Sequence, residues 1–204
     1  MTQSRFRVGL IACAALALGV AGATAQVNPK LVVTGKDAED VGEMNMINAA
    51  TAEAISHACE KMAADHGTSA AIVVLDTFGN IVHEHRMDGA ARYTAISTAQ
   101  MKAHTALLTR RATSARQYNV EQHPDQTARE FGLGYFPTSG GLPIWAGKQI
   151  IGFLGVGGQN PTAGWNDEIC GYQALTQVVG PQPALPTPPA PRAPAGGGAA
   201  RGAN

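Results

Sequence analysis

The stretch "SAAIVVLDTFGNIVHEHR", residues 69–86, decides the fold class of this chain. Two runs rich in β-branched residues flank Gly79 and Asn80, a pair typical of a tight turn between strands. The sequence therefore predicts a β-hairpin.

The second strand of this hairpin is dense in ionisable side chains. If it is extended, His83 and His85 share one face, while Glu84 and Arg86 share the other. A metal site at the two histidines needs further ligands, for which Asp76 or distant histidines are the candidates. No second ligand cluster occurs at a recognisable spacing, so a hairpin strand with a solvent-facing side is the favoured interpretation.

Helical patterns precede and follow the hairpin. Apolar residues at helical spacing from Val41 to His66 predict a long helix that stops at Gly67. A second helix is predicted within residues 93–111. It is apolar on two sides, which predicts contact with the sheet on one side and with a neighbouring subunit or a ligand on the other.

The rest of the core again predicts helices and a hairpin in alternation. A short helix is predicted to start at Thr113 or Ser114, with a looser segment following it through residues 123–139. Residues 140–158 predict a second hairpin that turns at Gly147 and Lys148. A closing helix follows, with Asn166 or Asp167 as its cap. Two hairpins divided by helices predict an α+β domain, an antiparallel sheet flanked by helices.

The two ends of the chain differ from this core. Residues 1–25 carry two arginines, an apolar run and a final "ATA", which together predict a cleaved secretory signal peptide. The apolar run is shorter than the roughly 20 residues of a membrane span, so no stable membrane insertion is expected after processing. Residues 181–204 are rich in proline, alanine and glycine, and predict a disordered tail. We expect a periplasmic or secreted protein.

The core, residues 28–180, has the size of one domain. Four of the chain's 15 basic residues lie in the end segments whereas all 15 acidic residues lie in the core, so the core is mildly acidic and no nucleic acid is expected as a partner. Cys59 and Cys170 remain after processing, each in a predicted helix. The sequence leaves open whether they form a disulfide or are two buried thiols.

Motifs of common enzyme classes are missing from the sequence. It contains no G-x-S-x-G segment, and "GVGGQN", residues 155–160, leads to Pro161 and not to the start of a helix. These glycines are therefore interpreted as turns and close backbone contacts. Neither a nucleophile-elbow hydrolase nor a dinucleotide-binding fold is predicted.

Six blocks of the core resemble the GlcG/HbpS family of haem-binding proteins, which also includes the C-terminal domain of PduO-type proteins. They occur in the family's order between Ile47 and Val179: "AIVVLDTFGNIV", "RMDGA", "KAHTALLTRRATS", "GGLPI", "GKQIIGFLGVGG" and "NDEICGYQAL". The resemblance implies an α+β domain with an antiparallel sheet of about five strands, assembly into homo-oligomers, and haem as the cofactor.

The resemblance also implies a set of binding residues. Thr113 matches a threonine implicated in haem contact, although Ala112 stands where the family has proline. His57 matches the region that supplies a haem ligand in some relatives, and it is the candidate metal ligand. Lys102 and Arg86 occupy typical family positions and are candidate cofactor-binding residues.

Each of these residues also has a structural interpretation. His57 is compatible with a histidine on the helix surface beside the core stripe. Lys102 is equally compatible with a solvated helix charge. Arg86 is compatible with a salt bridge to Asp88 that closes the hairpin loop.

Three functions are compatible with the sequence. The first is an exported haem- or tetrapyrrole-binding protein with a binding or sensing role. The second is an enzyme that acts on haem or on a small oxygenated metabolite. The third is an oligomeric scaffold without turnover. Because all three need the same fold, the sequence does not decide whether the chain is an enzyme.

Overall fold

The computed structural model describes residues 45–90, 93–159, 161–162 and 164–190. The signal peptide predicted for residues 1–25 lies outside these described residues. In chain order the elements are α2 (Ala49–Asp65), β1 (Ala71–Leu75), β2 (Ile81–Arg86), α3 (Ala95–Thr109), α4 (Ser114–Gln122), the 3₁₀ turn η2 (Pro124–Gln126), α5 (Thr127–Gly132), β3 (Gly141–Ala146), β4 (Gln149–Gly157) and α6 (Asp167–Val178).

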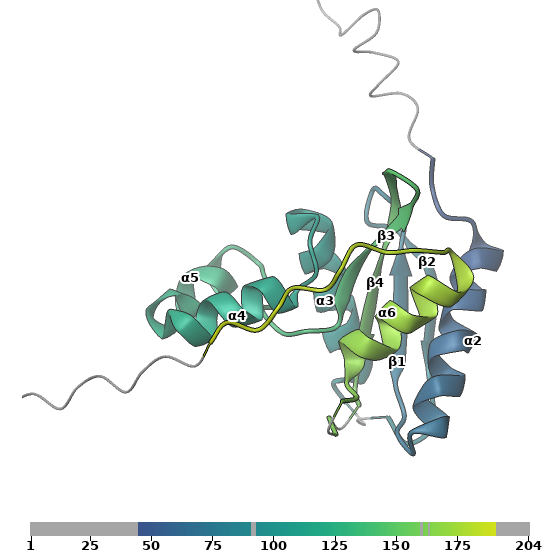
Figure 1. Ribbon diagram of the computed structural model, residues 1–204, viewed down its shortest axis with the longest axis horizontal. Helices are drawn as coiled ribbons and strands as arrows, with labels where there is room; N and C mark the ends of the chain where they lie inside the picture. Colours follow the sequence, from purple (N-terminus) through teal and green to yellow (C-terminus); the bar gives the residue numbers. More distant parts are fainter. Residues whose placement is uncertain (1–44, 91–92, 160, 163, 191–204) are drawn as a thin grey trace, which may run out of the picture. The chain divides into compact units, whose positions relative to one another are not determined.

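The strands form one antiparallel sheet in the order β2-β1-β4-β3 (Figure 1). Both predicted hairpins are confirmed, and the two hairpins meet through β1 and β4. The expected α+β class is therefore correct. The described residues form four strands and not about five. At the outer edge of β3, the side chain of Gln182 bonds to the backbone of Trp145.

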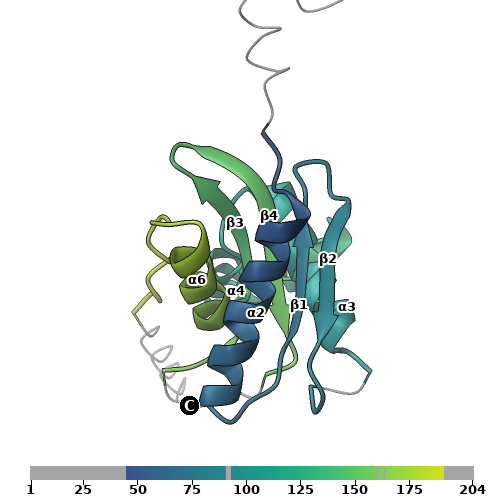
Figure 2. The same cartoon turned by 90° about the vertical axis from the view of Figure 1, so that its right-hand side faces the viewer.

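Helices cover both faces of the sheet. α2 and α6 lie on one face and α3 lies on the other, as the two views in Figures 1 and 2 show. Strand alternation separates two cores: Ile72 and Val74 of β1 pack with α2 and α6, whereas Val73 and Leu75 pack with α3. His83 and His85 pair with Val74 and Ile72, so the predicted division of β2 into two faces is confirmed.

α3 approaches β4 more closely than a side chain would allow. A Cβ atom added at Gly155 would overlap the carbonyl oxygen of Ala99, and one at Gly157 would lie 2.8 Å from the carbonyl oxygen of Ala95. The glycine run of "GFLGVGG" is therefore a helix-packing surface, in agreement with the predicted close backbone contacts.

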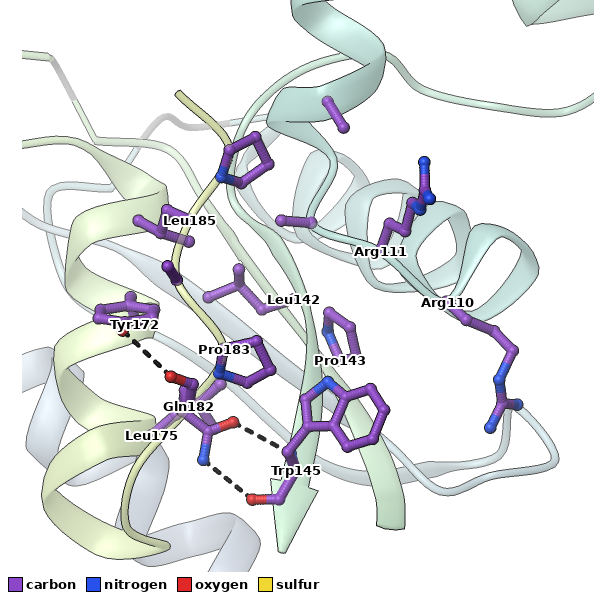
Figure 3. Close-up of a pocket in the computed structure, with 14 residues that line it drawn as sticks. Arg110, Arg111, Leu142, Pro143, Trp145, Tyr172, Leu175, Gln182, Pro183 and Leu185 are labelled. Carbon is purple, nitrogen blue, oxygen red and sulfur yellow. Dashed lines mark hydrogen bonds between the residues drawn. The ribbon is translucent and has the colours of Figure 1, made fainter. Parts of the chain in front are cut away.

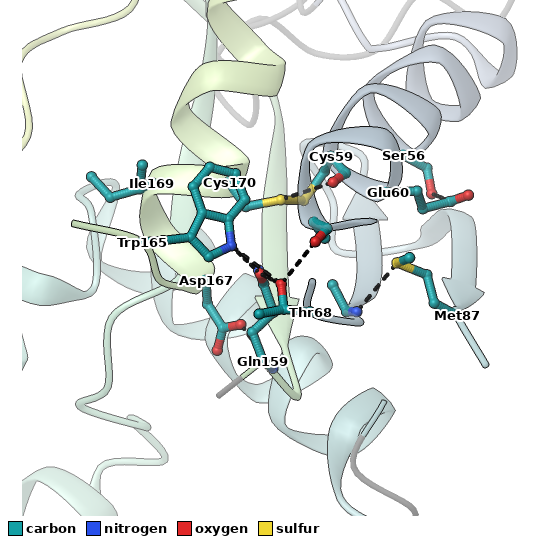
Figure 4. Close-up of a disulfide and its surroundings, with 12 residues drawn as sticks. Ser56, Cys59, Glu60, Thr68, Met87, Gln159, Trp165, Asp167, Ile169 and Cys170 are labelled. Atoms are coloured by element: carbon teal, nitrogen blue, oxygen red, sulfur yellow. Dashed lines mark hydrogen bonds between the residues drawn. A yellow bond between two sulfur atoms is a disulfide. The ribbon is translucent and has the colours of Figure 1, made fainter. Parts of the chain in front are cut away.

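Cys59 of α2 and Cys170 of α6 form a disulfide, with their Cα atoms 5.3 Å apart (Figure 4). Both cysteines are fully buried. The alternative that the sequence left open is thereby decided in favour of the bridge, which joins the two helices on one face of the sheet. Next to it, Trp165 Nε1 donates a 2.7 Å hydrogen bond to Gln159 Oε1.

The first helix begins later than its periodicity predicts. Residues 41–44 of the predicted helix lie outside the described residues, and residues 45–48 are not helical. Two contacts hold this entry segment: the Ile47 N–H donates to the Ile151 carbonyl oxygen at 2.8 Å, and the Asn48 side chain accepts the Thr51 N–H as the helix cap. Ile47 thus belongs to the core, but not to the helix.

One other segment is more ordered than expected. The predicted looser segment, residues 123–139, contains η2 and α5. Residues 181–190 of the predicted tail form no helix or strand, and they extend from the end of α6 across β3 toward α4 (Figure 1). There, the apolar side chain of Leu185 packs against the core. Residues 191–204 of the predicted tail lie outside the described residues. In the part of the chain that the structure describes, no helix combines the length and apolar character needed to cross a bilayer.

Candidate functional site

An apolar pocket of about 340 Å³ lies at β3, the edge strand of the sheet (Figure 3). Its floor is formed by Leu142 and Pro143 of β3 and by Leu175 of α6. Residues 182–186, which follow α6 and run beside it, form a further wall (Figure 3). Its size and apolar lining are those of a small-molecule site, which usually measures about 300–1,000 Å³.

Two arginines lie at the side of this pocket opposite α6. Arg110 ends α3 in the left-handed conformation, with a φ of 53°, and its N–H donates to the Ala106 carbonyl oxygen. This conformation ends α3 and turns the chain sharply. Arg110 and Arg111 therefore both lie in the short connection to α4, at the rim of the pocket. Arg110 and Arg111 are both exposed at this rim, and Figure 3 shows their side chains extending outward from Leu142 and Pro143.

Polar contacts in the pocket gather around Gln182. Its side-chain oxygen accepts the Trp145 N–H at 3.0 Å, and its Nε2 donates to the Trp145 carbonyl oxygen at 2.9 Å (Figure 3). The Tyr172 hydroxyl donates to the Gln182 backbone oxygen at 3.3 Å. Gln182 thus bridges α6 and β3.

A polar cleft of about 660 Å³ adjoins the apolar pocket and shares Arg111 and Ala115 with it. Within the cleft, Arg116 donates to both carboxylate oxygens of Glu130, at 2.9 and 3.2 Å, and also covers the ring of Tyr135. Its lining further includes Arg129. Arg111 and Arg129 make no ion pair among the described residues, so the cleft carries a positive excess beside an apolar space.

Lys102 is buried, with 3% of its surface exposed. Its Nζ lies 2.6 Å from Asp167 Oδ2 and donates a 3.0 Å hydrogen bond to the Val156 carbonyl oxygen. The interpretation of Lys102 as a solvated helix charge is therefore wrong. Lys102 ties α3 to the start of α6, and it does not line either pocket.

Burial changes the ionisation of the two acids that begin α6. Burial raises the pKa of Asp167 despite the opposing charge of Lys102. Burial likewise raises the pKa of Glu168, against hydrogen bonds from Ser114 and the Gly140 backbone and the charge of Lys102. Both carboxyl groups therefore resist ionisation, although the helix N-terminus favours negative charge.

Thr113 is fully buried beside this ion pair, just before α4. Its Oγ1 donates to the Thr138 carbonyl oxygen at 2.6 Å and accepts the Gly141 N–H at 2.9 Å. Its own N–H donates to the Gly141 carbonyl oxygen at 2.9 Å. The structure thus brings Thr113 and Lys102 together around residues 140–141, where the hydroxyl of Thr113 joins two segments of backbone.

His57 and Arg86 lie elsewhere. His57 is exposed on α2, and it does not line either pocket. Arg86 is exposed at the end of β2, the opposite edge strand from β3, and donates to the Ala90 carbonyl oxygen at 3.3 Å. No salt bridge between Arg86 and Asp88 occurs among the described residues.

A metal site at His83 and His85 of β2 needs further ligands. Among the described residues, no group of three or more His, Cys, Asp or Glu side chains could hold a metal ion. His85 Nε2 instead lies 3.9 Å from a carboxylate oxygen of Glu60 on α2.

Sequence reasoning missed the residues that form the apolar pocket. Arg110 and Arg111 stand inside the block "KAHTALLTRRATS", and Tyr172 inside "NDEICGYQAL", but neither spacing nor polarity distinguishes them from other surface residues. The adjacent pair of arginines at the end of the predicted helix, residues 93–111, was the available signal. Gln182 lay in the predicted disordered tail and offered none.

Comparison with known proteins gives the same family as the sequence blocks do. Residues 47–176 match the family model described as haem degrading protein, HbpS-like. The Klebsiella pneumoniae protein ORFY is 26% identical, with a TM-score of 0.56 over 66% of this chain and 93% of that protein. HbpS is also 26% identical, with a TM-score of 0.57 over 68% of this chain and 96% of HbpS.

A more distant structure is that of PduOC in complex with heme. It is 20% identical, with a TM-score of 0.57 over 64% of this chain and 94% of that chain, and this likeness shows a shared fold. No curated protein sequence matches this chain significantly.

Proposed function

We propose that this chain, which belongs to the HbpS-like family of haem degrading proteins, binds haem in the apolar pocket at β3. The single observation that carries the proposal is the pairing of an apolar space of about 340 Å³ with Arg110 and Arg111 at its rim. A tetrapyrrole with two propionates needs this combination of an apolar slot and cations.

The residues that line the pocket fit this cofactor. Leu142, Pro143 and Leu175 would face the apolar macrocycle, and the two guanidinium groups would meet carboxylates. Tyr172 is the one residue in the described pocket wall of a type that ligates haem iron in proteins, where phenolate ligation is known. When bound, haem would supply the redox chemistry of its iron.

The role that follows is binding or sensing. A hemin titration of the purified chain, with absorbance read in the Soret region, tests it. We expect saturation at one hemin per chain, with weaker binding in Arg111→Ala and an altered Soret band in Tyr172→Phe. A broad change that does not saturate would contradict haem binding.

The same hemin titration tests the predicted role of His57 as a haem ligand. His57→Ala is the matched comparison because His57 lies on the exposed side of α2, away from the pocket. Loss of binding in His57→Ala, with Arg111→Ala unchanged, would place the haem on α2 and reject the pocket.

Haem breakdown is the second candidate function, favoured by the description of the matching family. Supplying the hemin complex with a reductant and oxygen distinguishes it from binding. Loss of the Soret band over many equivalents of hemin, with release of iron, would show turnover. A stable stoichiometric complex would support binding or sensing.

We also propose that the protein is exported to the periplasm or secreted. The predicted signal peptide of residues 1–25 supports this, and so does the disulfide between Cys59 and Cys170, because such bridges persist in oxidising compartments. Fractionation of cells, followed by the mass of the alkylated protein, tests it. A reduced protein that starts at Met1 and remains in the cytoplasm would reject export.

A homo-oligomer is proposed from the outer face of α3. Met101 and Leu108 are 41% and 58% exposed there, seven residues apart on the helix side turned away from the sheet. Light scattering after gel filtration gives the subunit number. We expect Leu108→Glu to lower it, and Leu133→Glu, at a leucine of similar exposure on another segment, to leave it unchanged.

A further inference from the structure

The C-terminal strap, defined here as residues 181–190, lies beyond the family match, which ends at residue 176. Residues 182–186 of this strap nevertheless form one wall of the apolar pocket. The pocket is therefore built in part by a segment that the family pattern does not contain.

Gln182 connects the strap to the sheet by hydrogen bonds. The register of β3 and β4 shifts between Ile144 and Trp145, and Trp145 lies on the edge strand. The side-chain amide of Gln182 accepts the Trp145 N–H and donates to the Trp145 carbonyl oxygen, in the manner of a neighbouring strand. It also donates to the Gly180 carbonyl oxygen at 3.0 Å. Gln182 is thus a latch on an edge strand that would otherwise leave these groups to water.

Further contacts hold the strap along its length. Leu185 packs against the core, and the Tyr172 hydroxyl donates to the Gln182 backbone oxygen. Near its far end the Ala190 carbonyl oxygen accepts a 3.5 Å hydrogen bond from Gln122 of α4. The strap is therefore attached on both sides of the pocket, and the wall between these attachments is apolar.

The composition of this wall suits contact with an apolar ligand. Pro183 and Pro186 lack an N–H and have a restricted φ, so they present apolar surface with little entropy left to lose. A preorganised wall of this kind strengthens binding because few side chains are ordered when the ligand arrives.

We propose that the strap is a wall of the haem pocket, latched by Gln182, and that it retains the bound ligand. This inference rests on the proposed function. Because the latch touches backbone groups, Gln182 acts as a positioning residue.

The test is the dissociation rate of hemin from the full chain, measured by transfer to an excess of a haem-scavenging protein. We expect Gln182→Ala to release hemin about tenfold faster, as the loss of two latch hydrogen bonds suggests. Gln182→Glu keeps the size of the side chain but cannot donate to the Trp145 carbonyl oxygen. Its rate of hemin release should lie between those of the wild type and Gln182→Ala. Pro188→Ala is the matched control, since it lies in the strap but does not line the pocket.

Hydrogen exchange in the absence of hemin tests the contact between Gln182 and Trp145 directly. In the wild-type chain the Trp145 amide is protected by its hydrogen bond to Gln182, so its hydrogen exchange should quicken in Gln182→Ala. Faster exchange together with unchanged hemin release would overturn the strap inference and leave haem binding intact. Tighter binding in Gln182→Ala would also overturn it, because the strap would then exclude the ligand. If wild-type chain binds no hemin, the proposed function fails, and the strap inference fails with it.

Discussion

Lys102 of α3 and Asp167 of α6 form a buried ion pair, with 2.6 Å between Lys102 Nζ and Asp167 Oδ2. The pair joins the helix on one face of the sheet to a helix on the other face. The same ammonium group donates to the carbonyl oxygen of Val156 in β4, so one side chain connects all three layers. Its charge is already matched in the interior and is not offered to a ligand.

Removing this lysine should destabilise the fold. Lys102→Met leaves the Asp167 carboxyl buried without its partner, and breaking such a pair costs about 3–5 kcal/mol. The free energy of unfolding in urea measures the loss. Lys61→Met is the control, because Lys61 pairs with Asp65 on an exposed helix surface and should change stability little. Equal losses in the two variants would contradict a special role for the interior pair.

Stability should fall as pH rises through the range in which Glu168 ionises. Burial raises the pKa of Glu168 in the folded state, so the folded chain holds its proton more tightly than the unfolded chain does. The resulting stabilisation is complete below the unfolded pKa and is lost as pH rises through the higher folded pKa. Urea unfolding from pH 4 to pH 8 tests this.

Glu168→Gln should reduce this dependence on pH, and the exposed Glu53→Gln should leave it unchanged. Asp167 has a raised pKa as well, so part of the slope should remain in Glu168→Gln. An identical slope in the wild type and Glu168→Gln would reject the assignment.

The disulfide should contribute substantially to stability. It closes a loop with a sequence separation of 111 residues, and the loss of such a bridge costs about 2–5 kcal/mol. A double variant, Cys59→Ala with Cys170→Ala, should lower the melting temperature measured by calorimetry. Adding reductant should lower that of the wild type toward the same value and leave the variant unaffected. A variant as stable as the wild type would show that the bridge contributes little.

Gly155→Ala should push α3 away from the sheet. The added methyl group would overlap the Ala99 carbonyl oxygen, and both groups belong to rigid backbone. Overpacking of this kind costs about 1–3 kcal/mol or more. Gly132→Ala is the control, because nothing lies near its added Cβ, and it should be close to neutral in urea unfolding. A neutral Gly155→Ala would contradict the close helix packing.

Thr113 should matter first for structure. Thr113→Ala removes the acceptor of the buried Gly141 N–H and the donor to the Thr138 carbonyl oxygen, at a cost of about 1–3 kcal/mol. Thr113→Ser keeps the hydroxyl and should recover most of that loss in urea unfolding. Because Thr113→Ser also keeps any contact of the hydroxyl with a ligand, weak hemin binding in Thr113→Ser at full stability would show that the methyl group of Thr113 contacts the ligand.

Much of the fold could be predicted because local patterns decide it. Runs rich in β-branched residues within 71–86 and the turn at Gly79 specify a hairpin, and helical spacing with an Asn166 cap specifies α6. The start of α2 could not be predicted, because Ile47 is apolar at the helical spacing yet bonds to β4. Periodicity shows which residues are buried, but it does not show which element buries them.

The candidate site, in contrast, could not be predicted from local patterns. Lys102 and Thr113 could be singled out from the family resemblance, but their partners Asp167 and Gly141 are 65 and 28 residues away in the chain. The pocket joins the end of α3, an edge strand, α6 and the strap. No local pattern encodes such a meeting of distant segments.

By itself, the amino-acid sequence determined the α+β class, the two hairpins, the order of the helices and the family, because these depend on periodicity, turn residues and motif order within short windows. Tertiary structure alone decided that Cys59 and Cys170 meet, that Lys102 is buried in an ion pair, and that Gln182 latches a proline-rich strap to Trp145. Each of these depends on which distant segments pack together, and packing is set by the shape and burial of the whole domain.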